Sequence, residues 1–149
     1  MGIANRVDGE TALAIKDEVP EANYHYRSRL SIAKRPESTG SAVGNIAVVA
    51  AGTSNLTVAK EAFLVAQALS NQTELDVDAA EIHRLLEAWD CLPSAQVIMV
   101  VGGMAGALAS VIEELADCPV LAVLSLVGYG TAQGGMTAVL ASRINHLAD

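Results

Sequence analysis

Four consecutive residues, Gly52, Thr53, Ser54 and Asn55, combine backbone freedom with hydrogen-bonding side chains. They follow a run of aliphatic residues and precede a segment with helical periodicity. Glycine lets a ligand approach the backbone, the hydroxyls can donate hydrogen bonds, and a helix amino terminus attracts anions. The pattern therefore predicts a phosphate-binding loop. A helix N-cap is the alternative, because Ser, Thr and Asn are also the residues that most often begin helices.

Two further segments rich in glycine also follow aliphatic runs. Their members are Gly102, Gly103 and Met104 in the first segment, and Gly128, Tyr129 and Gly130 in the second. Glycine in these places could admit a ligand, or could let a helix pack tightly on a strand. The second segment resembles a dinucleotide-binding glycine loop, but that fingerprint needs an acidic residue about 20 positions later. The sequence leaves no room for it, so a Rossmann-type site is not expected.

Few titratable side chains accompany these segments. Asp76 stands in a predicted strand, and His83 and Arg84 stand early in the next predicted helix. Histidine beside carboxylates can transfer a proton near neutral pH, and arginine pairs with phosphate or carboxylate. His83 is therefore a candidate for catalysis, with a solvated surface pair as the alternative. Cys91 and Cys118 have no flanking His or Lys that would activate a thiol, and no metal site is expected.

The elements that must position these residues alternate along the chain. We expect strands at 45–51, 74–78, 96–101 and 119–124, and helices at 57–70, 80–90, 104–116 and 131–147. Strands that are unbroken aliphatic runs, alternating with helices, predict a parallel sheet covered on both faces. The fold class is thus α/β, a three-layer sandwich of flavodoxin-like topology. In such a sheet ligands bind beyond the carboxyl ends of the strands, where the glycine segments lie.

A polar connection at 35–41 divides the chain into two parts. We expect residues 1–40 to form an appendage, and residues 41–149 to form the α/β domain, truncated at its carboxyl end. In the appendage, a helix at 8–19 should bury Leu13 among its apolar residues. The apolar and aromatic side chains at 24, 26, 30 and 32 alternate with polar ones, which predicts one half-exposed strand.

Charge and composition exclude several classes of protein. The chain has 149 residues, a net charge of −8 and 52% hydrophobic residues, which suits one globular domain and excludes a disordered chain. Residues 41–149 carry three basic and eleven acidic side chains, so no nucleic-acid surface is expected. Two cysteines make no disulfide framework, and no secretion signal is present, so the expected compartment is the cytoplasm.

Two uncharged stretches, 91–112 and 118–142, are long enough to cross a membrane. Each is interrupted by closely spaced glycines, which favours a short buried strand followed by a helix. No membrane partner is therefore expected. The excess of aliphatic residues after position 91 exceeds what one small domain covers. Exposed apolar surface usually signals association, so we expect a homo-oligomer. We also expect a small-molecule ligand at the glycine segments.

Taken in order, these motifs resemble a known family. The segments AGTSN, DVDAAEIHRLL, VVGGMAGAL, CPVLAV and VGYGTAQGG look like the carboxylase-like domain of the LarB family. PEANYHYRSRLSIAKRP resembles the lead-in to that domain, so the resemblance covers nearly the whole sequence. LarB proteins carboxylate and cleave nicotinate adenine dinucleotide during synthesis of the nickel-pincer cofactor. Their domain is similar to PurE, the AIR carboxylase-like mutase of purine synthesis.

The resemblance implies an adenine nucleotide as ligand, no firmly held cofactor, and an octamer. Magnesium is compatible with the nucleotide's phosphates. By position, residues 52–54 match the family's phosphate loop, and His83 and Arg84 match a His-Arg pair of the substrate loop. Asp76 matches an acidic position at a strand end, and residues 128–130 match a conserved turn.

Several positions depart from the family's pattern. Asn55 stands where the family usually has Asp, Ala105 replaces an acid, and residues 143–147 lack the family's thiol. Carboxylation needs that thiolate as nucleophile and an acid/base group for the proton that is lost. We therefore predict a nucleotide-binding homo-oligomer without carboxylase chemistry, a pseudoenzyme. The alternatives are an active LarB/PurE-like carboxylase and a structural or regulatory oligomer without ligand.

Overall fold

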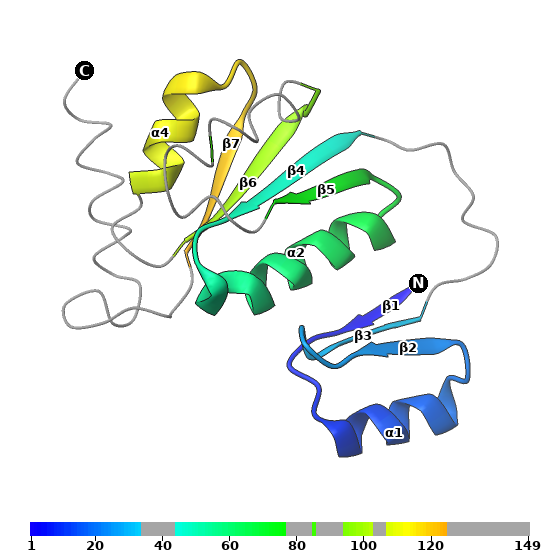
Figure 1. The fold of residues 1–149 in the computed structure, drawn as a ribbon. Helices are drawn as coiled ribbons and strands as arrows, with labels where there is room; N and C mark the ends of the chain where they lie inside the picture. Colours follow the sequence, from blue (N-terminus) through cyan, green and yellow to red (C-terminus); the bar gives the residue numbers. More distant parts are fainter. Residues whose placement is uncertain (34–43, 77–84, 86–93, 103–106, 125–149) are drawn as a thin grey trace.

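The computed structural model describes residues 1–33, 44–76, 85, 94–102 and 107–124. These residues form two sheets with helices packed on them (Figure 1). The predicted boundary at residue 40, and the predicted helix at 131–147, lie outside the described residues. Of the predicted helix at 80–90 only Leu85 is described, as a helical and fully buried residue. Within the described part, no helix is long and apolar enough to cross a membrane.

The larger sheet contains four parallel strands in the order β5-β4-β6-β7. The strands are β4 (Asn45–Ala50), β5 (Gln72–Asp76), β6 (Val97–Gly102) and β7 (Val120–Leu124). Each strand begins and ends within two residues of its predicted bounds. β4 therefore lies inside the sheet, with β5 on one side and β6 on the other.

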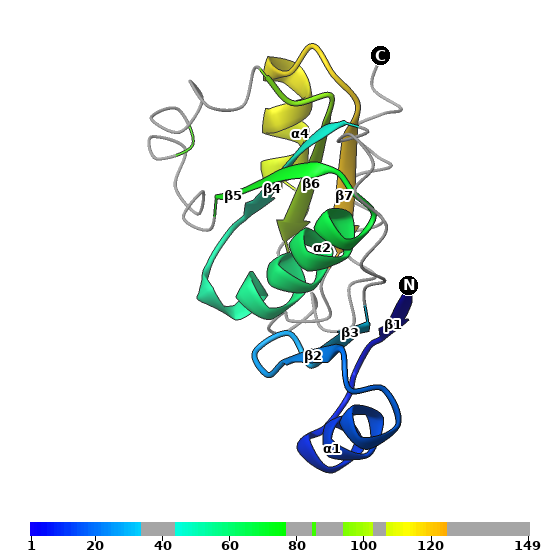
Figure 2. The ribbon, with the colours of Figure 1, turned by 90° about the vertical axis from the view of Figure 1, so that its right-hand side faces the viewer.

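Helices cover both faces of this sheet. Val48, Ala50 and Val101 point to one face and pack with α2 (Leu56–Ala68). Val49 and Ile98, among others, point to the opposite face and pack with α4 (Ala107–Leu115). Successive side chains in a strand alternate between faces, so a continuous aliphatic run is buried on both. Figures 1 and 2 show the two helices on opposite sides of the sheet, which confirms the three-layer α/β fold.

The smaller sheet is antiparallel, in the order β1-β3-β2, and α1 (Gly9–Glu18) joins its first two strands in sequence. Its strands are β1 (Gly2–Ala4), β2 (Ala22–His25) and β3 (Leu30–Ala33). β1 was not expected, because three residues are too few to show a periodicity.

The single strand predicted for this region is wrong, because the chain turns back between β2 and β3. His25 pairs with Leu30, and the amide of Arg29 donates to the carbonyl of Tyr26 (3.3 Å). The connection has four residues, an even number, so the alternation of side chains continues across it unchanged. A period of two therefore does not distinguish this hairpin from one long strand.

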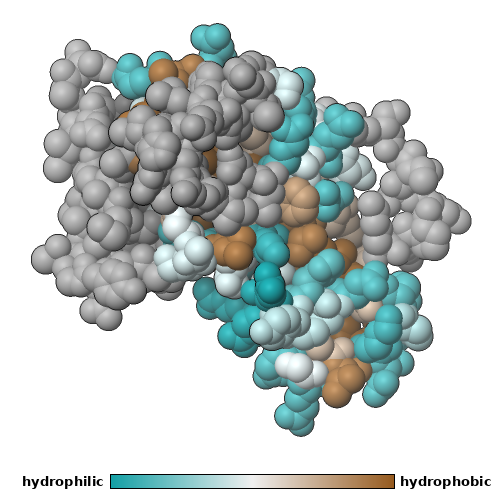
Figure 3. All heavy atoms as spheres, in the orientation of Figure 1, coloured by the Kyte–Doolittle hydropathy of each residue, from teal (hydrophilic) through white to brown (hydrophobic). Residues whose placement is uncertain are grey.

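The helix predicted at 8–19 is confirmed, but its buried face is partly wrong. Ala12 is buried, whereas Leu13 is 70% exposed. In Figure 3, brown apolar atoms lie among hydrophilic ones over α1.

α2 has a second apolar stripe, which faces the smaller sheet. Leu64, Val65 and Ala68 of this stripe pack with Leu30 and Ile32 of β3. α2 therefore contributes side chains to the cores of both sheets. The sequence pattern of the predicted helix at 57–70 places Leu69 on its inward face, but Leu69 is 52% exposed just after the helix ends.

The start of α1 makes a testable electrostatic contribution to stability. The Asp8 carboxylate accepts a hydrogen bond from the backbone N–H of Thr11 (2.8 Å), and this bond lowers the pKa of Asp8 below its ordinary value. With the lower pKa in the folded state, the contribution is complete above about pH 4, the unfolded value. It is lost as the pH falls through the folded value.

We therefore expect the melting temperature of the wild type to fall more steeply than that of Asp8→Asn between pH 5 and pH 2. Asparagine is an equally good N-cap but does not titrate. Thermal denaturation followed by circular dichroism at a series of pH values measures both proteins. Parallel pH profiles of the two proteins would contradict the expectation.

Candidate functional site

The carboxyl ends of β4 and β6 meet at the point where the chain leaves the sheet in two directions. The chain after β4 forms α2 on one face, and the chain after β6 leads to α4 on the other. The amide of Ala51 donates to the carbonyl of Val101 (3.2 Å), which brings Gly52 and Gly102 to the same edge. Ligands of open α/β sheets bind in the crevice at such a switch point.

Gly52 turns the chain sharply as it leaves β4. Its φ of 79° and ψ of 150° are a combination that residues with a Cβ rarely adopt. A short 3-10 helix, Thr53–Asn55, follows and leads directly into α2. The predicted glycine loop is therefore a tight turn at the carboxyl edge of the sheet.

Asn55 holds this turn together from inside. Its side chain is buried, and its Nδ2 donates to the carbonyl of Ala51 (2.6 Å). Asn55 occupies the N-cap of α2 but makes no side-chain capping hydrogen bond there. Thr53 and Ser54 are exposed, so their hydroxyls face the surroundings of the edge. Of the residues predicted as a phosphate loop, Asn55 is therefore internal and stabilises the turn, whereas Thr53 and Ser54 are accessible.

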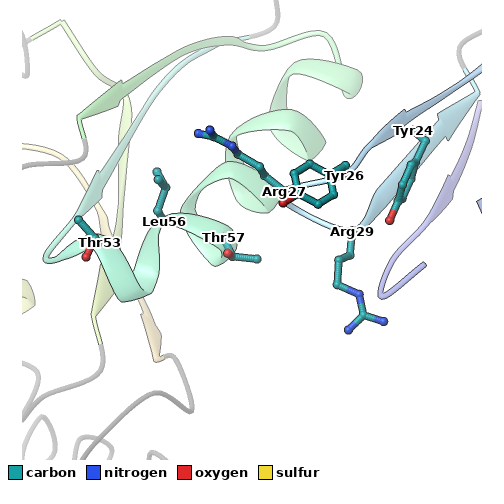
Figure 4. A pocket seen from close by; sticks show the side chains of 7 residues that line it. All are labelled: Tyr24, Tyr26, Arg27, Arg29, Thr53, Leu56 and Thr57. Carbon is teal, nitrogen blue, oxygen red and sulfur yellow. The ribbon is translucent and has the colours of Figure 1, made fainter. Parts of the chain in front are cut away.

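A cavity of about 520 Å³ opens beside this turn, between the hairpin and the start of α2. Its lining residues come from both parts of the described chain: Tyr24, Tyr26, Arg27, Arg29, Thr53, Leu56 and Thr57. Figure 4 shows Arg27 and Arg29 leaving the hairpin in different directions, with Tyr26 beside Arg27. The hairpin therefore supplies one wall of the cavity, and the 3-10 helix with the start of α2 supplies the other.

Hydrogen bonds to the backbone fix part of the hairpin wall. The guanidinium of Arg29 donates to the carbonyls of Val7 (3.4 Å) and Arg6 (3.1 Å), and the hydroxyl of Tyr24 donates to Val7 (3.0 Å). Among the described residues, no carboxylate forms an ion pair with Arg27. Arg27 is exposed and available to a ligand.

The charge of the cavity is opposite to that of the chain. Among the described residues, two arginines and no acidic residue line it, whereas the whole chain has a net charge of −8. A concave surface lined by one sign of charge concentrates the field and attracts ligands of the opposite sign. Together with the tyrosines and the hydroxyls of Thr53 and Thr57, it suits an anionic ligand that carries an aromatic ring.

The structure places six of the predicted site residues. Gly52, Thr53, Ser54, Asn55 and Gly102 lie at the carboxyl edge of the sheet, and Asp76 ends β5 beside β4. Seven others lie outside the described residues: His83, Arg84, Gly103, Met104, Gly128, Tyr129 and Gly130.

Sequence reasoning missed the contribution of the hairpin to the site. The sequence analysis places the hairpin residues of the cavity in an appendage whose net charge is zero. These residues are Tyr24, Tyr26, Arg27 and Arg29. Local charge would have been the better signal, because two arginines in one short turn stand out in an acidic chain. Thr57 was taken only as the start of a helix.

Cys118 does not belong to this site. It comes two residues before β7 and packs, partly buried, against the core cluster between the sheet and α4. That position is the amino-terminal edge of the parallel sheet, opposite to the cavity. In the described part of the chain, no group of three or more His, Cys, Asp or Glu side chains is arranged to hold a metal ion.

The fold and the cavity together define a three-layer α/β protein with a cationic cavity between its amino-terminal hairpin and the start of α2. No family model matches the chain. It is similar to a protein of the archaeon Methanocaldococcus jannaschii, the uncharacterized protein MJ0165, with 33% identity over 140 residues. The match covers 87% of this chain and 55% of the relative, so the chain spans about half the length of the curated relative.

Proposed function

We propose that this chain binds an adenine nucleotide in the cavity beside Gly52. One observation carries the proposal: the exposed hydroxyl of Thr53, at the end of β4, lines the same cavity as Tyr26 and Arg27 of the hairpin. Phosphate is stabilised by arginine and by the free N–H groups at the start of a helix, and an aromatic side chain can stack on a base.

The size of the cavity and the sequence resemblance support this ligand class. A volume of about 520 Å³ lies within the range of about 300–1,000 Å³ that is typical of small-molecule sites. The motifs of the chain resemble those of the LarB family, whose substrate contains adenine. Magnesium would be bound by the phosphates of the nucleotide rather than by side chains of the protein.

Binding without carboxylation is the form of the proposal that we favour. Ala105 stands where the LarB pattern has an acid. Loss of a general acid or base typically lowers a rate about 10²- to 10⁴-fold. The alternative is an active LarB/PurE-like carboxylase, and incubation with bicarbonate and nicotinate adenine dinucleotide, followed by mass spectrometry, separates the two. A carboxylated product would favour the alternative.

The proposal includes self-association in the cytoplasm. Leu115 of α4 and Leu121 of β7 are 45% and 55% exposed, which is unusual for large aliphatic side chains at the end of a helix and within a strand. The resemblance implies an octamer, and light scattering measures the mass. A purely structural oligomer would assemble in the same way but would bind no nucleotide.

Titration with AMP tests the proposed ligand. We expect saturable binding, and we expect Arg27→Gln to weaken it by about tenfold or more, because a hydrogen bond to a charged group is lost. Thr53→Val should weaken binding as well, since its hydroxyl lines the cavity. Isothermal titration calorimetry gives the dissociation constant of each variant.

Arg6→Gln is the charge-matched control. Arg6 lies between β1 and α1 and does not line the cavity, so its loss should change the affinity for AMP by less than about twofold. Failure of AMP to bind at millimolar concentration, or equal affinities of wild type and Arg27→Gln, would overturn the proposal.

A further inference from the structure

A second cavity lies on the other side of the hairpin turn. Its volume is about 350 Å³, and its lining residues are His25, Tyr26, Arg27, Ser28, Lys60, Phe63 and Leu64. Tyr26 and Arg27 also line the first cavity, but the residues of α2 differ between the two. The first cavity uses the start of α2, and the second uses its middle.

The spacing of the α2 residues explains why two cavities form. Thr57, Lys60 and Leu64 are three and four positions apart, so they lie on one face of the helix. At the Leu64 end, this part of the helix packs against Leu30 and Ile32 of β3. Toward the start of α2 the hairpin no longer packs closely, and a space remains on each side of its turn.

The second cavity combines positive charge with apolar surface. Arg27 and Lys60 both line it. In the described part of the chain, no acidic residue lines it and neither cation has a carboxylate partner. Lys60 is half-buried, so its charge is partly removed from water. Phe63 and Leu64 of α2 and Tyr26 of the hairpin supply the apolar part of the lining.

The turn that carries Arg27 is held in place. Ser28 is buried, and its hydroxyl donates to the carbonyl of His25 (3.3 Å). A fixed turn reduces the entropy that a ligand must remove when it binds between Arg27 and Lys60. The cavity is therefore prepared for a ligand rather than closed by its own side chains.

We propose that this second cavity binds a small aromatic anion, through Lys60, Phe63 and Leu64, which do not line the nucleotide cavity. A single anionic group would lie between Arg27 and Lys60, and one aromatic ring would contact Phe63 and Leu64. An inorganic anion would leave the apolar wall unused, and a neutral arene would leave two cations without a partner. A ligand with both an anionic group and an aromatic ring is therefore the class that fits this cavity.

Phenyl phosphate is the probe that we would use, with the 149-residue chain and saturation-transfer NMR. We expect saturable binding, and we expect inorganic phosphate and benzyl alcohol each to bind about tenfold more weakly. Lys60→Gln should weaken phenyl phosphate about tenfold, because one charged partner is lost. Arg6→Gln is the charge-matched control, since Arg6 lines neither cavity.

The outcomes separate this site from the nucleotide site. Weaker binding in Lys60→Gln together with unchanged binding in Arg6→Gln supports the second site, even if AMP does not bind at all. Equal binding in Lys60→Gln and wild type, or an equal loss of binding in Lys60→Gln and Arg6→Gln, overturns it. Circular dichroism of Lys60→Gln confirms that the variant is folded before the affinities are compared.

Discussion

Replacement of Leu30 by alanine is expected to lower the free energy of unfolding by about 2–5 kcal/mol. Leu30 is fully buried, and it packs with Leu64, Val65 and Ala68 of α2. Removal of its side chain leaves a void between the smaller sheet and α2, where neither sheet can move in to fill it without losing its own contacts. Urea denaturation followed by circular dichroism gives the change.

Leu13→Ala removes the same side chain from an exposed position. Leu13 is 70% exposed on α1, so this change should alter the free energy of unfolding by less than about 0.5 kcal/mol. The pair of variants separates burial from residue type. Equal effects of the two substitutions would show that Leu30 is not packed between the two sheets as described.

Gly52→Ala is expected to lower stability by about 1–3 kcal/mol, entirely through the backbone. Among the described residues, a Cβ at this position would meet no atom closer than the Ser54 hydroxyl, at 4.0 Å, so no steric clash with them contributes. The cost arises because alanine rarely adopts a φ of 79°. Either the strain remains or the turn relaxes, and relaxation would move Thr53 and weaken AMP binding as well.

Gly9→Ala is the matched control for Gly52→Ala. Gly9 begins α1, and a Cβ there would meet nothing within 4 Å. Alanine is the better helix former, so this variant should be as stable as the wild type or slightly more stable. Thermal denaturation of both variants tests the comparison, and similar melting temperatures for the two would contradict a special role for Gly52.

The parallel sheet could be predicted from the sequence because its physical cause is local. A strand covered on both faces must be aliphatic at every position, and the run from Ile46 to Ala51 is so regardless of what covers it. The same argument predicts that the glycine segments after the strands lie at one edge of the sheet. Gly52 and Gly102 were placed at one edge in this way.

The hairpin wall of the site could not be predicted in the same manner. Its position depends on how β3 docks on α2, and that contact joins Leu30 and Ile32 to residues more than thirty positions away. Side-chain periodicity describes the neighbours of a residue within one element and contains no information on docking. The prediction that Leu13 is buried was wrong for a related reason, because α1 has more apolar residues than its sheet can cover.

The two apolar stripes of α2 have a consequence for how such a chain can evolve. α2 packs in the cores of both sheets. A chain that lost residues 1–33 would therefore expose Leu64, Val65 and Ala68, which pack on β3. Exchange of the amino-terminal unit by recombination would require matching substitutions on the outer face of α2. The two units are therefore expected to be retained, lost or duplicated together, as one heritable module.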